Sequence, residues 1–400
     1  MQNVLRDNQI IKKKDDVQLA AIWLPVLYLL SFIVCSDTVR FSFGVDLSFL
    51  FVLGIIFFYF TFYKNHISKA SFYGWWIYLL IVPTLIMCLM KDGDMGHMIH
   101  CTLIMILPIV LEPFIPHDDK TISFGLYFVV GVSLLLLFLY ANFGILGNWN
   151  TNCMGYLLFL GFAALTVLLS KNRKNVWLWV FYAYAFVQLL VTDSRNISIA
   201  VIVTALLVLL KGPISKKWVY RVIYTFAILY PLIFPWIATE MVGTALYEWL
   251  AEITETIYDK GQGGVFSGRP KLYLGAEKLI GESWVHYLFG YGKTMVSFYA
   301  AHNGYYVLHY TYGLIGTLVI VGALIYFFEK TFVLIKAGDS IAYGCFAIMI
   351  SVLFQQASEG WFLGTYLITL MPFVYMAIVI KRYRIYMQKR KNENEKEKDE

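Results

Sequence analysis

Two arginines and one histidine are the side chains of this sequence best suited to chemistry. Arg195 lies in the polar stretch "TDSRN", Arg269 in "SGRPK" and His302 in "AHNGYY". A planar guanidinium binds phosphate oxygens through two parallel hydrogen bonds. A neutral imidazole at a water boundary can take a proton from a hydroxyl near pH 7. Each residue alone could instead be an interfacial anchor or a structural group, so their function depends on whether they meet at one surface.

The composition is that of an integral membrane protein. Of the 400 residues, 59% are hydrophobic and 14% are charged, and the mean hydropathy is +0.65, whereas soluble domains carry about 25% charged residues. The apolar stretches have the length of spanning helices, which predicts an all-α fold. The five cysteines are scattered without metal or redox spacing. Basic residues form no patch with interleaved aromatics, so nucleic acid is excluded as a partner.

Apolar windows of about 19 residues predict about twelve spanning helices. They lie near 18–36, 47–63, 74–90, 98–115, 121–142, 153–170, 176–192, 197–211, 218–238, 304–328, 341–357 and 361–380. Most of the 32 Lys and Arg residues then fall on one side, which the positive-inside rule assigns to the cytoplasm together with both chain ends. The spans are almost free of charge, and Glu112 is the exception.

This topology divides the chain into five parts: a cytoplasmic N-terminus (1–17), nine spans (18–238), a large extracytoplasmic loop (239–303), three spans (304–380) and a charged cytoplasmic tail (381–400). The tail starts basic, as a membrane-surface anchor does, and is expected to end disordered. In the loop, "TALYEWLAEITETI" has the pattern of an interfacial helix, and a second helix is expected to start at "SGRPK" with Pro270 at its first helical position. Arg269 would then lie at a helix N-terminus, which favours anions.

Several short motifs occur in an order that resembles the superfamily of bacterial O-antigen polymerases and O-antigen ligases. These are "NWNTNCMGYLLF", "DSRNISIAV", "SGR", "FGYG" and "AHNGYYVLHYTYGLIG". The resemblance covers roughly residues 150 to 316. It implies a type-C glycosyltransferase-like fold in the bacterial cytoplasmic membrane. It also implies an enzyme that joins undecaprenyl-diphosphate-linked oligosaccharides at the outer face, as a Wzy-type polysaccharide polymerase.

The resemblance also implies roles for individual residues. Arg195 and Arg269 look like diphosphate-binding arginines, and His302 looks like the catalytic histidine. Substrate-binding roles are expected for Asn152, Ser194, Trp284, Tyr291, Asn303, Tyr305 and Glu359. We expect neither a metal nor another cofactor, because the two arginines would replace the divalent cation that many glycosyltransferases use. Partners implied with the polymerase are a chain-length regulator and a flippase.

Two other functions fit parts of the same pattern. A ligase of the same superfamily would transfer a finished glycan to a different acceptor, and the sequence does not separate it from a polymerase. A lipid-linked sugar flippase or other transporter would be expected to show internal repeats and charged residues within its spans. The sequence shows neither, which favours the enzyme.

Overall fold

The computed structural model describes residues 54, 85–87, 89–90, 106–143, 151–190, 195–258, 269–293, 302–358 and 370–399. Within these ranges every regular element is a helix, which confirms the all-α prediction. The helices are η2 (Glu112–Phe114), α7 (Asp119–Phe143), α8 (Thr151–Lys171), α9 (Val176–Leu190), α10 (Arg195–Leu209), α11 (Lys211–Ile214), α12 (Lys217–Met241), α13 (Ala245–Tyr258), α14 (Arg269–Ile280), α15 (Trp284–Phe289), α16 (Gly304–Lys336), α17 (Ser340–Gln355) and α18 (Leu370–Asp399). Most of the first four predicted spans lies outside the described residues.

Three helices are long and apolar enough to cross a membrane: residues Asp119–Leu139 of α7, the whole of α12 and the whole of α16. Helices α9, α10 and α17 are apolar but shorter. The bounds of these helices agree with the predicted spans to within a few residues, except that α16 runs on to Lys336. These findings support a membrane protein, whereas the count of twelve spans, the orientation and the type-C glycosyltransferase fold remain predictions.

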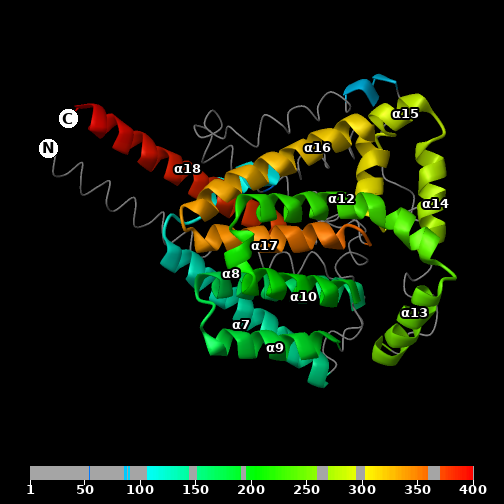
Figure 1. Cartoon of the computed structure of the whole chain (residues 1–400), viewed down its shortest axis with the longest axis horizontal. Coiled ribbons are helices and arrows are strands. Elements are labelled where there is room, and N and C mark those ends of the chain that lie inside the picture. The colour runs from blue at the N-terminus through cyan, green and yellow to red at the C-terminus, as the bar shows by residue number, and fades with distance from the viewer. Residues whose placement is uncertain are drawn as a thin grey trace.

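Helix α17 forms the centre of the bundle. It packs against α8, α10, α12, α16 and α18, and Figure 1 shows α12, α17 and α10 running alongside one another. Nearly all of its side chains are buried, because the helix is apolar on every face and neighbours cover each face. Tyr343 donates to the Leu207 carbonyl at 2.5 Å and Ser351 donates to the Ala200 carbonyl at 2.8 Å. These two bonds fix α10 and α17 as antiparallel neighbours.

Charged side chains join α18 to one end of the bundle, which we call the basic end. The side chain of Glu112, only 1% exposed, forms ion pairs with Lys381 at 3.6 Å and with Arg384. Burial lowers the pKa of Lys381, and the nearby Glu112 carboxylate partly offsets this effect. A buried carboxylate without such partners would be costly. Glu112 is therefore explained by its partners at the basic end.

Helix α18 continues to Asp399, so the expected disorder of the tail end is wrong. The reason lies in the alternation of Lys and Glu, both of which are strong helix formers. Lys389 pairs with Glu393 at 4.0 Å and Lys391 with Glu395 at 3.7 Å, each at helical i,i+4 spacing. The same charges that indicated a solvated segment therefore stabilise a solvated helix.

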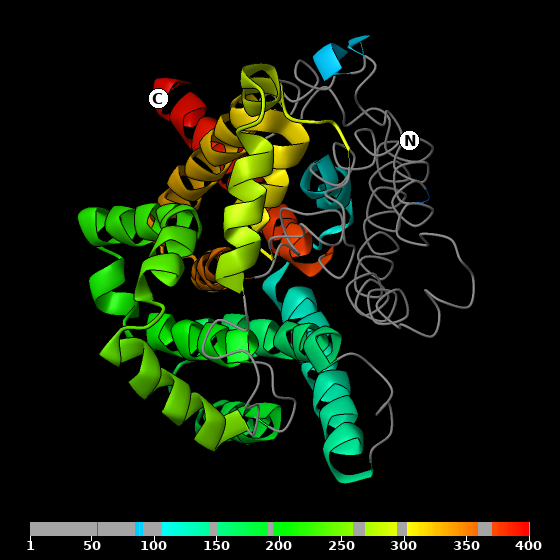
Figure 2. The same cartoon turned by 90° about the vertical axis from the view of Figure 1, so that its right-hand side faces the viewer.

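The opposite end of the bundle, which we call the loop end, carries α13, α14 and α15 (Figure 2). Both helices predicted within the long loop are present, and α14 starts at Arg269, one residue before the expected first position at Pro270. On α13 the apolar side chains of Leu246 and Trp249 are 54% and 56% exposed. An apolar stripe left open on an amphipathic helix is typical of a helix that lies on a membrane surface.

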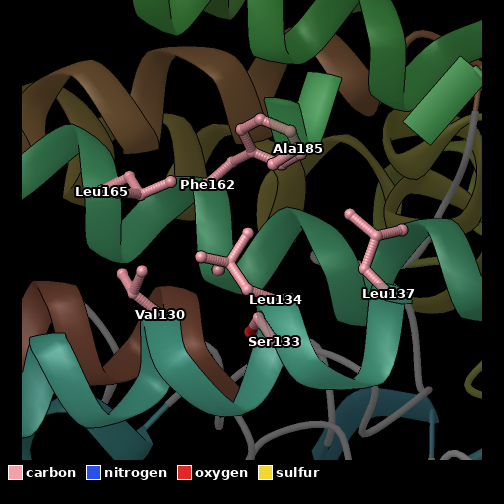
Figure 3. A pocket seen from close by; sticks show the side chains of 8 residues that line it. Val130, Ser133, Leu134, Leu137, Phe162, Leu165 and Ala185 are labelled. Carbon is pink, nitrogen blue, oxygen red and sulfur yellow. The ribbon is translucent and has the colours of Figure 1, made fainter. Parts of the chain in front are cut away.

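A small crevice lies between α7, α8 and α9 (Figure 3). It is lined by Val130, Ser133, Leu134, Leu137, Gly161, Phe162, Leu165 and Ala185. Apart from the Ser133 hydroxyl these side chains are apolar, so the crevice has no charged group that could hold a diphosphate. The candidate site is therefore built at the loop end, where the predicted polar residues lie.

Candidate functional site

Asn303 fixes the start of α16. Its side chain is fully buried, and its Oδ1 accepts hydrogen bonds from the backbone N–H groups of Tyr305 at 2.9 Å and Tyr306 at 3.1 Å. Asparagine is among the residues best suited to this position, because it satisfies N–H groups that have no partner within the helix. The cap sets the direction in which the chain enters α16, and with it the position of His302 one residue earlier.

The amide nitrogen of Asn303 joins the start of α16 to α12 and to the turn that follows α17. Nδ2 donates to the Pro231 carbonyl at 2.8 Å and to the Ala357 carbonyl at 3.1 Å. The Pro231 carbonyl is open to Asn303 because Pro235, four residues later in α12, has no N–H to donate. The Asn303 amide thus makes four hydrogen bonds inside the protein. This favours a positioning role for Asn303, and its predicted substrate contact stays a prediction.

Helix α14 brings Arg269 to the same junction. Tyr273 donates its hydroxyl hydrogen to the Ala357 carbonyl at 3.1 Å, the carbonyl that Asn303 also uses. Arg269 precedes Tyr273 by one helical turn, so both lie on one face of α14. Arg269 is half-buried and is the first residue of the helix, where unpaired N–H groups and the helix dipole favour an anion. The helix that begins with Arg269 and the segment that carries His302 are therefore joined at one carbonyl.

His302 has an unusual backbone conformation. Its φ is 44°, and it is the one non-glycine residue with positive φ among those that the structure describes. This left-handed conformation costs an ordinary residue about 1–2 kcal/mol, because Cβ approaches the following carbonyl oxygen. The side chain is exposed, while Asn303 beside it is fully buried. A strained, exposed histidine held by a rigid neighbour is the kind of backbone outlier that clusters at functional sites.

The glycines of "FGYG" approach the backbone of α16. Gly313, with φ of 67°, interrupts the helix, and the first part of α16 turns away from its long part (Figure 1). Two carbonyls before the break accept bonds from the "FGYG" segment: Tyr291 N–H to Tyr310 O at 2.6 Å and Gly292 N–H to Thr311 O at 3.1 Å. The "FGYG" segment is thus bonded to the backbone of the chain itself, and it fastens α15 to α16.

Replacing Gly290 by alanine is expected to destabilise the protein by about 2–4 kcal/mol. Its φ is 81°, and an added Cβ would collide with the backbone of Thr311 and Gly313, which cannot move aside as a side chain could. Thermal unfolding of the purified protein in detergent measures the effect. The control is Gly131→Ala within α7, where nothing lies within 4 Å of the added methyl group. Equal stability of the two variants would contradict this account of the fastening.

The aromatic residues predicted to bind sugar occupy three different environments. Tyr291 is buried in a stack between His286, with ring centres 4.1 Å apart, and Tyr310, at 4.6 Å. Burial and the nearby Glu282 carboxylate raise the pKa of Tyr291, so it is a neutral phenol at pH 7. Tyr305 is 1% exposed, whereas Trp284 is 72% exposed at the start of α15. Of the three, Trp284 has a ring face open to a sugar.

Arg195 lies across the bundle from α14, at the start of α10. Because α10 and α17 are antiparallel and Ser351 bonds Ala200, the first turn of α10 lies level with the end of α17. The structure therefore places the backbone of Arg195 at the loop end. Asn152 lies in the first turn of α8, at the same end. Ser194 and Glu359 lie outside the described residues.

Sequence reasoning missed Glu277 and Tyr273. Tyr306 donates its hydroxyl hydrogen to the Glu277 carboxylate, and Tyr273 donates its own to the Ala357 carbonyl. Both could have been found from spacing, since they follow Arg269 at four-residue intervals and so share its face of α14. Glu277 adds one carboxylate to the loop end, on the helix that carries Arg269.

Within the described ranges, no group of three or more His, Cys, Asp or Glu side chains is arranged to hold a metal ion. The expectation of a metal-independent site stays a prediction. No family model, no curated protein and no solved structure matches this chain. The sequence motifs and the geometry of the loop end are therefore the observations that bear on its function.

Proposed function

We propose that this protein is a membrane glycosyltransferase that joins undecaprenyl-diphosphate-linked oligosaccharide repeat units into a polysaccharide. It would work at the outer face of the bacterial cytoplasmic membrane, without a metal ion. Its partners would be the lipid-linked substrates and other assembly proteins, such as a flippase and a chain-length regulator.

The observation that carries this proposal is the shared carbonyl of Ala357. It accepts from Tyr273, one turn after Arg269, and from Asn303, directly after His302. The helix that begins with Arg269 and the segment that carries the exposed His302 thus converge on one carbonyl, although the two residues lie 33 positions apart in the sequence. This convergence supports a functional interpretation of both residues.

The transfer reaction requires one group that stabilises negative charge on the leaving diphosphate and another that accepts the proton of the acceptor hydroxyl. The acceptor hydroxyl oxygen attacks the anomeric carbon of the donor sugar, and the bond from that carbon to the diphosphate oxygen breaks. The electron pair of the broken bond leaves with the diphosphate, where Arg269 and Arg195 would stabilise the added charge. The hydroxyl proton passes to the imidazole of His302 as general base. Atoms and charges balance without a further reactant.

The direct test uses purified protein in detergent and the lipid-linked oligosaccharide that accumulates in cells lacking the gene. We expect a ladder of polymer lengths on a gel, unchanged by EDTA. Transfer of one glycan to a different acceptor would instead identify a ligase. In sealed vesicles, movement of the lipid across the bilayer without a new glycosidic bond would contradict the proposal and identify a transporter.

A further inference from the structure

Two fully buried side chains at the loop end carry polar atoms that form no hydrogen bond within the protein. Gln355, the last residue of α17, is 0% exposed, and neither its amide oxygen nor its amide nitrogen has a hydrogen-bond partner. Tyr305, in the first turn of α16, is 1% exposed, and its hydroxyl also has none. Most buried polar groups in proteins are paired, and leaving one unpaired is costly.

A third such group faces Gln355 from α10. The Nδ2 of Asn196 is buried and without a partner. Ser351 bonds Ala200, and each lies one helical turn from one of the unpaired residues: Gln355 follows Ser351 by four positions, and Asn196 precedes Ala200 by four. Because the helices are antiparallel, Gln355 and Asn196 lie at one level on facing sides.

Tyr305 lies close to the same level. The N–H of Gly304, one residue before it, donates to the Gln356 carbonyl at 2.8 Å, one residue after Gln355. Other polar side chains of these helices are paired: Ser351 with Ala200 and Asn303 with Pro231. Among the described residues of α10, α16 and α17, the buried side-chain atoms without a hydrogen-bond partner therefore lie where these three helices meet.

The three groups suit the hydroxyls of a sugar. A carboxamide both donates and accepts, and a phenol does the same, as hydroxyl groups require of their partners. None of the three is charged, so they offer a diphosphate little. Arg195, which is suited to phosphate, directly precedes Asn196 in the chain. The arrangement therefore puts uncharged hydrogen-bonding groups next to the residue predicted to hold the phosphate attached to that sugar.

We propose that Asn196, Tyr305 and Gln355 form a saccharide site that binds hydroxyls of the sugar next to the diphosphate. This inference rests on the proposed function, because it takes a lipid-linked sugar as the ligand. The four unpaired polar atoms of these residues are closed to solvent in this structure, so the sugar enters when the helix ends separate. The hydrogen bonds it makes favour that open form, since they exist in no other state.

The test measures thermal unfolding of the purified full chain in detergent, with increasing amounts of either of two lipids. One is the undecaprenyl-diphosphate oligosaccharide that accumulates in cells lacking the gene, and the other is undecaprenyl diphosphate. A ligand raises the Tm according to its affinity. For the wild type we expect a larger rise with the oligosaccharide than with the bare diphosphate.

The deciding variants are Gln355→Met and Tyr305→Phe, which keep volume and remove unpaired polar atoms. We expect each to unfold at the same or a higher temperature than the wild type without lipid, because nothing paired is lost. We expect each to bind the oligosaccharide about tenfold more weakly while binding the bare diphosphate as before. The control Ser351→Ala, on the same face of α17, breaks a paired bond, so it should lower the Tm and keep the preference for the oligosaccharide.

Three results would overturn the inference. Variants that keep the wild-type preference would show that the polar atoms have no part in binding. Equal stabilisation of the wild type by both lipids would rule out the saccharide site, although it would still support binding of the diphosphate. A wild type stabilised by neither lipid would overturn the proposed function, and the saccharide site with it.

Discussion

Replacing His302 by alanine is expected to slow polymer formation by about 10²–10⁴-fold, the usual contribution of a general base. The protein should stay folded, because the side chain is exposed and fills no core space. The measurement is the rate of joining purified lipid-linked repeat units in detergent, with the amount of folded protein checked by thermal unfolding. Polymerisation of the alanine variant at the wild-type rate would show that His302 is not the base.

The backbone of His302 allows a second variant that separates strain from chemistry. His302→Gly also removes the imidazole, but glycine adopts the φ of 44° without penalty. The glycine variant should therefore be about 1 kcal/mol more stable than the alanine variant and equally inactive. His309 is the histidine control: its Nε2 lies 2.8 Å from the Tyr287 carbonyl, which marks it as a packing residue of α16. His309→Ala should lose less activity than His302→Ala.

Replacing Arg269 by alanine should lower the rate by about 10²–10³-fold, the range found when one group that stabilises developing negative charge is removed. Arg269→Lys keeps the positive charge and loses the planar fork, so most of that loss should remain. Initial rates at saturating lipid substrate measure the effect on the chemical step.

The matched control for Arg269 is Lys271→Ala on the same helix. Lys271 is exposed and lies two residues further along, which turns it away from the face that Arg269 shares with Tyr273. If only net charge at the loop end mattered, the two alanine variants would lose similar activity. A near-normal rate of polymer formation by Arg269→Ala would show that Arg269 is only an interfacial anchor.

Local sequence signals predicted the helices and several of their ends. Apolar length gave the ranges of α7 to α10 and α12, and Pro270 in a first turn marked the start of α14 at Arg269. These features depend on residues a few positions apart, so they can be read along the chain. The tail was misjudged because its charges were weighed for solvation and not for the i,i+4 pairs that stabilise a helix.

The partners of the site residues could not be predicted, because they lie far away in sequence. Asn303 bonds a carbonyl 72 positions earlier and another 54 positions later. The glycines of "FGYG" allow a sharp turn or a close approach, but they do not indicate the partner, which is the backbone beside a break in the next helix. Such contacts follow from how helices pack, and no local pattern encodes that packing.

The break at Gly313 also affects how deep the start of α16 would lie in a bilayer. A straight helix of the 33 residues of α16 would be about 50 Å long, well beyond the roughly 30 Å of hydrocarbon in a membrane. The part from Gly313 to Lys336 is close to that thickness by itself. The preceding turns, with His302 ahead of them, would then lie in the headgroup layer, where a lipid keeps its diphosphate. A lipid-linked sugar could therefore reach the histidine by lateral diffusion, with its hydrocarbon chain still in the bilayer.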